Sequence, residues 1–234
     1  MRRTDLAYWA LAIGTAASIA TLLAFVFLRV PVAQPEAGGL AQKIFYFHVP
    51  AAYAMYLSGV VCGVASGAYL ARPTTGRDAL AHAAAETAVV FGAMVLVSGP
   101  LWARKAWGVY WTWDPRLTTL LLSVLVYGTV VLLRSFAAGG DAERRFAAAI
   151  GVLGTVNLPI IHYSVRKWGG NHPTVIGKGG GGLRHPDMTL ALSLGFVALT
   201  LLAVLLLWSR ARLRAAEHRV ASLEERLLTA EGLS

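Results

Sequence analysis

Residues 188–208 read MTLALSLGFVALTLLAVLLLW, a run of 21 residues without a charged side chain. The hydrocarbon core of a bilayer is about 30 Å thick, and a helix needs roughly 20 apolar residues to cross it. This stretch therefore predicts a membrane-spanning helix. Five further segments resemble it, so that the predicted spans are residues 6–28, 51–71, 84–102, 117–133, 146–163 and 188–208.

The composition agrees with an all-α integral membrane protein. Of the 234 residues, 56% are apolar and 14% are charged, and the mean hydropathy is +0.58. Soluble domains have about 45–50% apolar and about 25% charged residues, so a soluble fold is excluded, and disorder is excluded by the same figures. The single cysteine, Cys62, excludes an internal disulfide and CxxC chemistry, and we expect it to be a small buried side chain.

The two ends of the chain are predicted to lie in the cytoplasm. Arg2 and Arg3 precede the first span as in a signal peptide, but its apolar run is too long and no small-residue cleavage site follows, which predicts a retained anchor. Six spans then form a domain over residues 1–208. Residues 209–234 form a cytoplasmic tail whose apolar side chains recur every three or four residues, typical of an amphipathic helix on the inner leaflet or of a docking helix for a partner.

The net charge of +9 must be divided between the two sides of the membrane. In this topology the cytoplasmic segments carry 12 Lys and Arg residues and the outer loops carry 9. Because the outer loops contain only three acids, Glu36, Asp114 and Asp187, they retain a net charge of +6. On a soluble protein such an excess would suggest nucleic acid; here we predict no nucleic-acid partner, and an outer face that attracts anionic groups.

The segment WARKAWGVYWTWDPRLT, residues 102–118, contains four of the seven tryptophans. One interpretation is an interfacial aromatic belt. The other is a binding platform, because Trp107, Trp111 and Asp114 are spaced i, i+4 and i+7 and would share one face of a short helix along the membrane surface, with Trp113 pointing elsewhere. A flat apolar surface with charges at its rim suits a large planar ligand with anionic edges.

Two histidines lie at the same outer interface as this segment. His48 occurs in KIFYFHVPAA, where a loop enters the second span, and His172 occurs in WGGNHP, after the fifth. Neutral imidazole is a common ligand of haem iron, so these two residues are either paired axial ligands or structural. His162 and His185 are rival ligands; for His162 we prefer an orienting role through hydrogen bonds.

The remaining polar signals are weaker. His82 and His218 have no patterned neighbours and are predicted to be structural. Glu86, the only carboxylate within a predicted span, either is functional, or it snorkels to the interface or pairs with Arg72 or Arg77. The glycine-rich residues 177–182 lack the GxxxxGK[ST] pattern and predict a flexible hinge, so the chain has no predicted nucleotide site and we do not expect an enzyme.

Three motifs together resemble one group of membrane proteins. The run WGVYWTWD, residues 107–114, followed by PRLT, resembles the tryptophan-rich WWD signature of haem-handling proteins of the CcmC, CcmF and CcsA types. The segments FHVPAA, at 47–52, and VNLPIIHYSV, at 156–165, resemble the haem exporter protein C (CcmC) family, over roughly residues 1–210. CcmF and CcsA relatives have more spans or a different histidine layout.

This resemblance implies a transient, non-covalent haem b site, with the WWD segment in the second periplasmic loop of a bacterial inner-membrane protein. It implies His48 and His172 as axial ligands of the haem iron, and a surface that comprises Trp107, Trp111, Trp113 and the signature acid Asp114. Arg116 is our candidate for a haem propionate, because a guanidinium matches a carboxylate in bidentate geometry. Tyr110, where relatives carry Trp, and the glycines after His172 depart from the pattern.

The resemblance also implies partners and leaves alternatives. The partners are the haem chaperone CcmE, the CcmA–CcmB ABC transporter, which would supply the missing ATP-driven step, the small protein CcmD, and membrane lipid.

A transmembrane haem transporter would need a polar path, yet Glu86 is the only acid within the spans. An electron-transferring cytochrome b usually pairs histidines within facing helices. A haem-attachment enzyme of the lyase type fits the larger WWD relatives better.

Overall fold

The computed structural model describes residues 3–34, 38–136, 140–172 and 183–230. It contains six α-helices and one short 3-10 helix in the order α1 (Arg3–Leu28), η2 (Gly39–Ile44), α2 (Phe45–Ala71), α3 (Thr75–Ala106), α4 (Pro115–Phe136), α5 (Asp141–Trp168) and α6 (Pro186–Ala230). The described residues contain no β-strand. The glycine-rich residues 177–182, predicted to be a hinge, lie outside the described residues.

Six of these helices are long and apolar enough to cross a membrane, which confirms the predicted all-α fold of a multi-pass membrane protein. Each predicted span lies within one helix, and the helices extend past the predicted boundaries. Helix α3, for example, begins at Thr75, nine residues before the predicted span, and the Thr74 hydroxyl caps it by accepting a hydrogen bond from the Arg77 N–H at 3.3 Å. Polar residues at the ends thus prolong helices whose centres are apolar.

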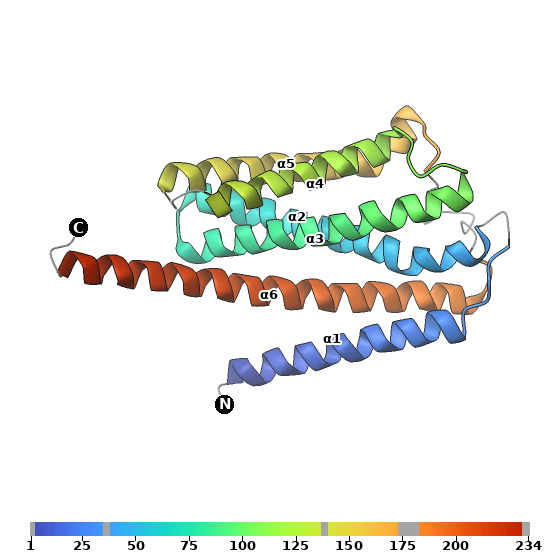
Figure 1. Cartoon of the computed structure of the whole chain (residues 1–234), viewed down its shortest axis with the longest axis horizontal. Helices are drawn as coiled ribbons and strands as arrows, with labels where there is room; N and C mark the ends of the chain where they lie inside the picture. The colour runs from blue at the N-terminus through green and yellow to red at the C-terminus, as the bar shows by residue number, and fades with distance from the viewer. Residues whose placement is uncertain (1–2, 35–37, 137–139, 173–182, 231–234) are drawn as a thin grey trace.

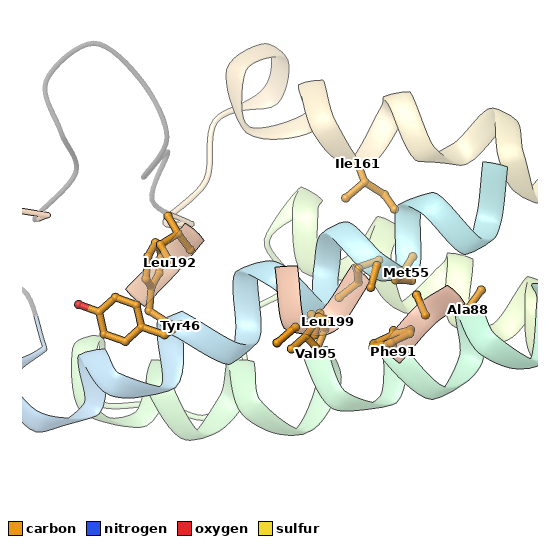
Figure 2. Close-up of a cluster of buried hydrophobic side chains, with 14 of the residues drawn as sticks. Tyr46, Met55, Ala88, Phe91, Val95, Ile161, Leu192 and Leu199 are labelled. Atoms are coloured by element: carbon orange, nitrogen blue, oxygen red, sulfur yellow. The ribbon is translucent and has the colours of Figure 1, made fainter. Parts of the chain in front are cut away.

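Helix α2 is central to the bundle. It packs against α3, α5 and α6, while α4 packs against α3 and α5, and α1 packs against α6. Figure 1 shows the two termini at one end of the elongated molecule and, at the other, the end of α1, the connection between α3 and α4, the end of α5 and the start of α6. Figure 2 shows part of the core, to which α2 contributes Met55, α3 Phe91 and Val95, and α6 Leu199.

Helix α6 approaches the start of α2 closely because Gly195 has no side chain. A Cβ at Gly195 would lie only 2.5 Å from the Tyr46 carbonyl oxygen and 2.8 Å from Cγ of Pro50. Contacts below about 3 Å do not occur for real Cβ atoms. This glycine therefore permits the two helix backbones to meet beside His48, which lies between Tyr46 and Pro50 in α2.

The tail is continuous with the sixth span. Helix α6 has 45 residues, corresponding to about 68 Å at 1.5 Å per residue. It projects past the N-terminal end of α1 (Figure 1). The sequence contains neither Gly nor Pro between Trp208 and Ala230, so nothing ends the helix at the membrane boundary. The tail is therefore no separate helix within the described residues.

Ion pairs join this helix to α3 at the end near the termini. Glu86 of α3 accepts a hydrogen bond from Nε of Arg210 at 2.8 Å and also pairs with Arg214. Its predicted alternative partners were wrong: Arg77 instead donates to the carbonyls of Ala68 and Arg72. Arg210 and Glu86 are 124 positions apart in the sequence, so no local sequence pattern indicates that they pair.

Candidate functional site

A cavity of about 1280 Å³ opens at the end of the bundle opposite the two termini. Its walls combine the first turns of α2, α4 and α6, the last turns of α3 and α5, and residues 32–34 before η2. Predicted site residues that line it are His48, Trp107, Trp111, Arg116 and His172. Residues that are far apart in the sequence therefore meet in one space.

The segment between α3 and α4 is not the short helix that the i, i+4, i+7 spacing predicts. Helix α3 ends at Ala106, and Gly108 has a left-handed φ of +78°, which breaks the helix. Trp107 and Trp111 line the cavity, but Trp113 is 75% exposed and does not. The ring of Trp113 instead meets that of Trp111 edge-on at 5.8 Å.

Asp114 is buried behind the cavity wall and joins two loops. Its Oδ2 accepts hydrogen bonds from the backbone N–H groups of Asn171 at 2.7 Å and His172 at 3.2 Å, and its Oδ1 accepts one from the Arg116 N–H at 2.8 Å. Gly170, at φ +137°, permits this approach, because a Cβ there would overlap the carboxylate. The acid thus holds the loop that carries His172 against the tryptophan-rich segment.

Arg116 contacts both histidines near the end of α5. Its Nη1 lies 3.3 Å from Nδ1 of His172, and its Nη2 donates to the carbonyl oxygen of His162 at 3.0 Å. A guanidinium only donates hydrogen bonds, so Nδ1 of His172 is the acceptor and the neutral ring carries its proton on Nε2. The backbone of His162 thus has the orienting contact that we preferred, although its side chain also lines the cavity.

His48 is held from the opposite side, by α3. Its Nδ1 lies 2.8 Å from the Ser98 hydroxyl, which itself donates to the Met94 carbonyl at 2.6 Å. Because that hydroxyl hydrogen is already used, Nδ1 of His48 donates, and Nε2 keeps its lone pair. Gly99 leaves room for the ring, since a Cβ there would lie 3.2 Å from Cε1 of His48.

Two buried donors in the cavity wall have no partner within the described part of the chain: Nε1 of Trp111 and Nε of Arg116. Buried polar groups are nearly always hydrogen-bonded, so such donors indicate an acceptor that the described residues do not supply. Arg166 and Arg184 also line the cavity, and no carboxylate does among the described lining residues. The unpartnered N–H donors and the positive charge of the wall both favour an anionic group on the ligand.

Several residues of the cavity wall were not predicted from the sequence. Trp102, whose ring meets that of Trp107 edge-on at 5.5 Å, also lines the cavity, and its place in the aromatic segment was an available signal. Nothing in the local pattern distinguishes Ser98. The rival His185 lines the cavity too.

His82 is buried beside Glu86, His218 contacts Asp78 at 3.1 Å, and Cys62 is buried, in agreement with their structural roles.

Comparisons with known proteins place the chain in a family. Residues 2–226 match the family described as Heme exporter protein C. The heme exporter protein C of Bradyrhizobium diazoefficiens is 35% identical over 189 residues, which are 80% of this chain and 71% of that protein. That of Rhodobacter capsulatus is 30% identical over 225 residues, 90% of this chain and 88% of that protein. That of Escherichia coli K12 is 39% identical over 140 residues, 57% of this chain and about half (55%) of that protein. The chain therefore belongs to the heme exporter protein C family.

Proposed function

We propose that this protein holds haem b in the cavity, non-covalently and transiently, and presents it to the haem chaperone CcmE during cytochrome c maturation. The observation that supports this most is the convergence of His48 and His172 on one cavity whose described lining includes cations and no carboxylate. Imidazole is a haem-iron ligand, and haem combines an apolar ring with anionic propionates. The cavity also exceeds the roughly 300–1,000 Å³ of most ligand pockets, so a large planar ligand has room.

The residues divide the binding of haem between them. His48 needs no rearrangement to bind iron, because the hydrogen bond of its Nδ1 to Ser98 leaves the lone pair of Nε2 available. His172 is the second ligand, and coordination through its Nε2 requires Arg116 to release Nδ1. Arg116, once released, can pair with a propionate, for which its unpartnered Nε–H is suited. The haem supplies the reactive chemistry, and the chain binds and orients it.

The tryptophans would act in two ways. Trp107 and Trp111 line the cavity and are placed to contact the ring, whereas Trp113 is exposed outside it. We assign Trp113 to the surface that meets CcmE rather than to the stacking surface. The outer loops, with their net charge of +6, would attract an acidic patch on that chaperone.

The absorbance spectrum of the purified protein tests the ligands. Alanine at His48 or His172 should remove or shift the Soret band of bound haem, and alanine at His82, which lies at the opposite end, is the control. An unchanged spectrum for either variant, or loss of the band on His162→Ala or His185→Ala instead, would show that the ligand assignment is wrong. Incubation of the loaded protein with CcmE, followed by haem staining, tests presentation.

The purified protein can also be tested for two alternative functions. A haem transporter would move haem into proteoliposomes that lack any acceptor, and a lyase-type enzyme would attach haem to an apocytochrome without CcmE. We expect neither activity. The accessory roles of the CcmA–CcmB transporter and of CcmD belong to this proposal and are tested by copurification with the full chain.

The proposed topology places both termini in the cytoplasm and the cavity at the periplasmic face of the bacterial inner membrane, with residues 209–234 as the cytoplasmic tail. It rests on the excess of Lys and Arg in the inner segments, 12 against 9. The buried Cys62 can be replaced by alanine, after which single cysteines at Tyr110 and Ser222 report sidedness. An impermeant maleimide should label the first and not the second in intact spheroplasts; the reverse result would invert the topology.

A further inference from the structure

The wall of the cavity is partly exposed along one flank of α2. The residues Val49, Tyr53, Tyr56 and Val60 are spaced i, i+4, i+7 and i+11, so they form one stripe on this helix, and all four line the cavity. Tyr53 is 44% exposed and Val60 is 45% exposed, although both belong to the cavity wall. We call this stripe, together with Phe196 of α6, the lateral groove.

The neighbouring helices leave Tyr53 and Val60 of this stripe exposed and cover Val49 and Tyr56 in part. On one side α6 meets α2 at Tyr46 and Pro50, and Phe196 contacts Tyr53 edge-on at 5.4 Å. On the other side α5 meets α2 deeper in the bundle, where Thr155 donates a hydrogen bond to the Gly59 carbonyl at 3.1 Å. Both α5 and α6 pack against α2, but among the described residues they do not form a packed pair with each other.

The lateral groove lies at membrane depth. Val60 is 12 residues beyond His48 in α2, which corresponds to about 18 Å along the helix axis. It is two residues past Ser58, the midpoint of a helix long and apolar enough to span the bilayer. An opening at this depth faces lipid hydrocarbon and not water.

The polarity of the cavity changes along its length. Arg116, Arg166 and Arg184 line its outer end, and the deep end beside Val60 is apolar. An amphiphile in the adjoining leaflet has the same orientation, with its anionic groups at the interface and its apolar body in the hydrocarbon. Such a molecule can pass sideways into the cavity without turning over and without exposing its apolar surface to water.

We infer that haem reaches the two histidines laterally, from the membrane leaflet that surrounds the cavity, through the groove between α5 and α6. This inference rests on the proposed haem site, and it assigns a loading route to that site. The apolar ring would slide along Val60 and Tyr53 while the propionates remain near Arg116 and Arg166.

The test blocks the groove and measures loading. Wild type, Val60→Trp and Val64→Trp are reconstituted into phosphatidylcholine vesicles, and haemin, which partitions into the bilayer, is added while the Soret band of the protein-bound form is followed. Val64 is the matched control, because it follows Val60 by one turn on the same helix, is 68% exposed and does not line the cavity. Val49→Trp is a second blocking variant, used if Val60→Trp is not monodisperse.

We expect the blocking variant to load at least tenfold more slowly than wild type, with the same final amplitude, and Val64→Trp to load at the wild-type rate. Equal rates for wild type and a monodisperse blocking variant would overturn the lateral route and leave the haem site intact. A wild-type protein that acquires no haem band would instead contradict the proposed function. The two failures are therefore distinguishable.

Discussion

The backbone N–H of His172 donates a hydrogen bond to Oδ2 of Asp114 across 3.2 Å and across 58 positions of sequence. The same oxygen accepts the N–H of Asn171, and the other oxygen accepts that of Arg116. One buried carboxylate thus joins the loop of a proposed iron ligand to the start of α4. The acid of the tryptophan-rich motif therefore acts on the position of His172 without lining the cavity itself.

Asp114→Asn should loosen His172 without changing the size of the side chain. The amide loses the charge that strengthens the three N–H contacts, and hydrogen bonds to charged groups are worth about 1.5–3 kcal/mol each. A loss of about 2 kcal/mol corresponds to roughly 30-fold weaker haem binding. Haem titration followed at the Soret band measures this. Asp141→Asn, at the other end of α5, is the control, and equal affinities for the two variants would contradict the role assigned to Asp114.

Arg116→Ala should discriminate between haem and its dimethyl ester. If Arg116 pairs with a propionate, its removal weakens the binding of haem by roughly tenfold, in line with one charge-assisted hydrogen bond. The ester has no carboxylate, so its affinity should change by less than the affinity for haem. Arg104→Ala, a cation outside the cavity wall, should affect neither ligand. An identical loss for haem and its ester would show that Arg116 acts only by positioning His172.

Gly99→Ala should displace His48. The new Cβ would lie 3.2 Å from Cε1 of the imidazole, which is tighter than most contacts, and overpacking typically costs about 1–3 kcal/mol. We expect roughly fivefold weaker haem binding, from the lower end of that range, and a shifted Soret maximum. Gly67→Ala on α2 is matched to it, since its Cβ would have 4.0 Å to the nearest side-chain atom, and should leave the spectrum unchanged.

Trp111→Ala and Trp113→Ala should have different effects. Trp111 lines the cavity, so its loss should weaken haem binding, by about 0.5–1.5 kcal/mol for one lost aromatic contact. Trp113 is exposed outside the cavity, so its loss should leave haem affinity nearly unchanged and slow transfer to CcmE. Haem titration and a timed transfer assay separate the two effects. Equal losses of haem affinity for the two variants would show that Trp113 belongs to the surface that stacks on haem.

Glu86→Gln should destabilise the protein without affecting the haem site. It leaves Arg210 and Arg214 without their shared carboxylate, and removal of one partner from a fully buried pair costs about 3–5 kcal/mol. Because Arg210 is 39% exposed, we expect roughly 2 kcal/mol, seen as a lower midpoint of thermal unfolding in detergent. Glu143→Gln, an exposed acid at the start of α5, should leave the midpoint unchanged.

Much of the fold was predictable because it depends on local composition. A bilayer requires about 20 apolar residues per helix, and this requirement is visible in each segment separately, from residues 188–208 to the shorter 117–133. The helix boundaries were less predictable, since polar flanks such as those of α5 continue a helix equally well. The single spacing argument that failed, for Trp107 to Asp114, did so because Gly108 ends the helical conformation that the spacing presupposes.

The sequence by itself determined that the chain has six segments able to cross the membrane as helices, and that four of its six histidines and five of its seven tryptophans lie toward one end of them. Only the tertiary structure decided which of these side chains share a cavity, that Asp114 supports the His172 loop from behind, and that Trp113 lies outside. The physical reason is range. Helix formation in a membrane is set by neighbouring residues, whereas the long-range partners of Asp114, Arg116 and Glu86 lie 46 to 128 positions away and meet them only when the helices pack.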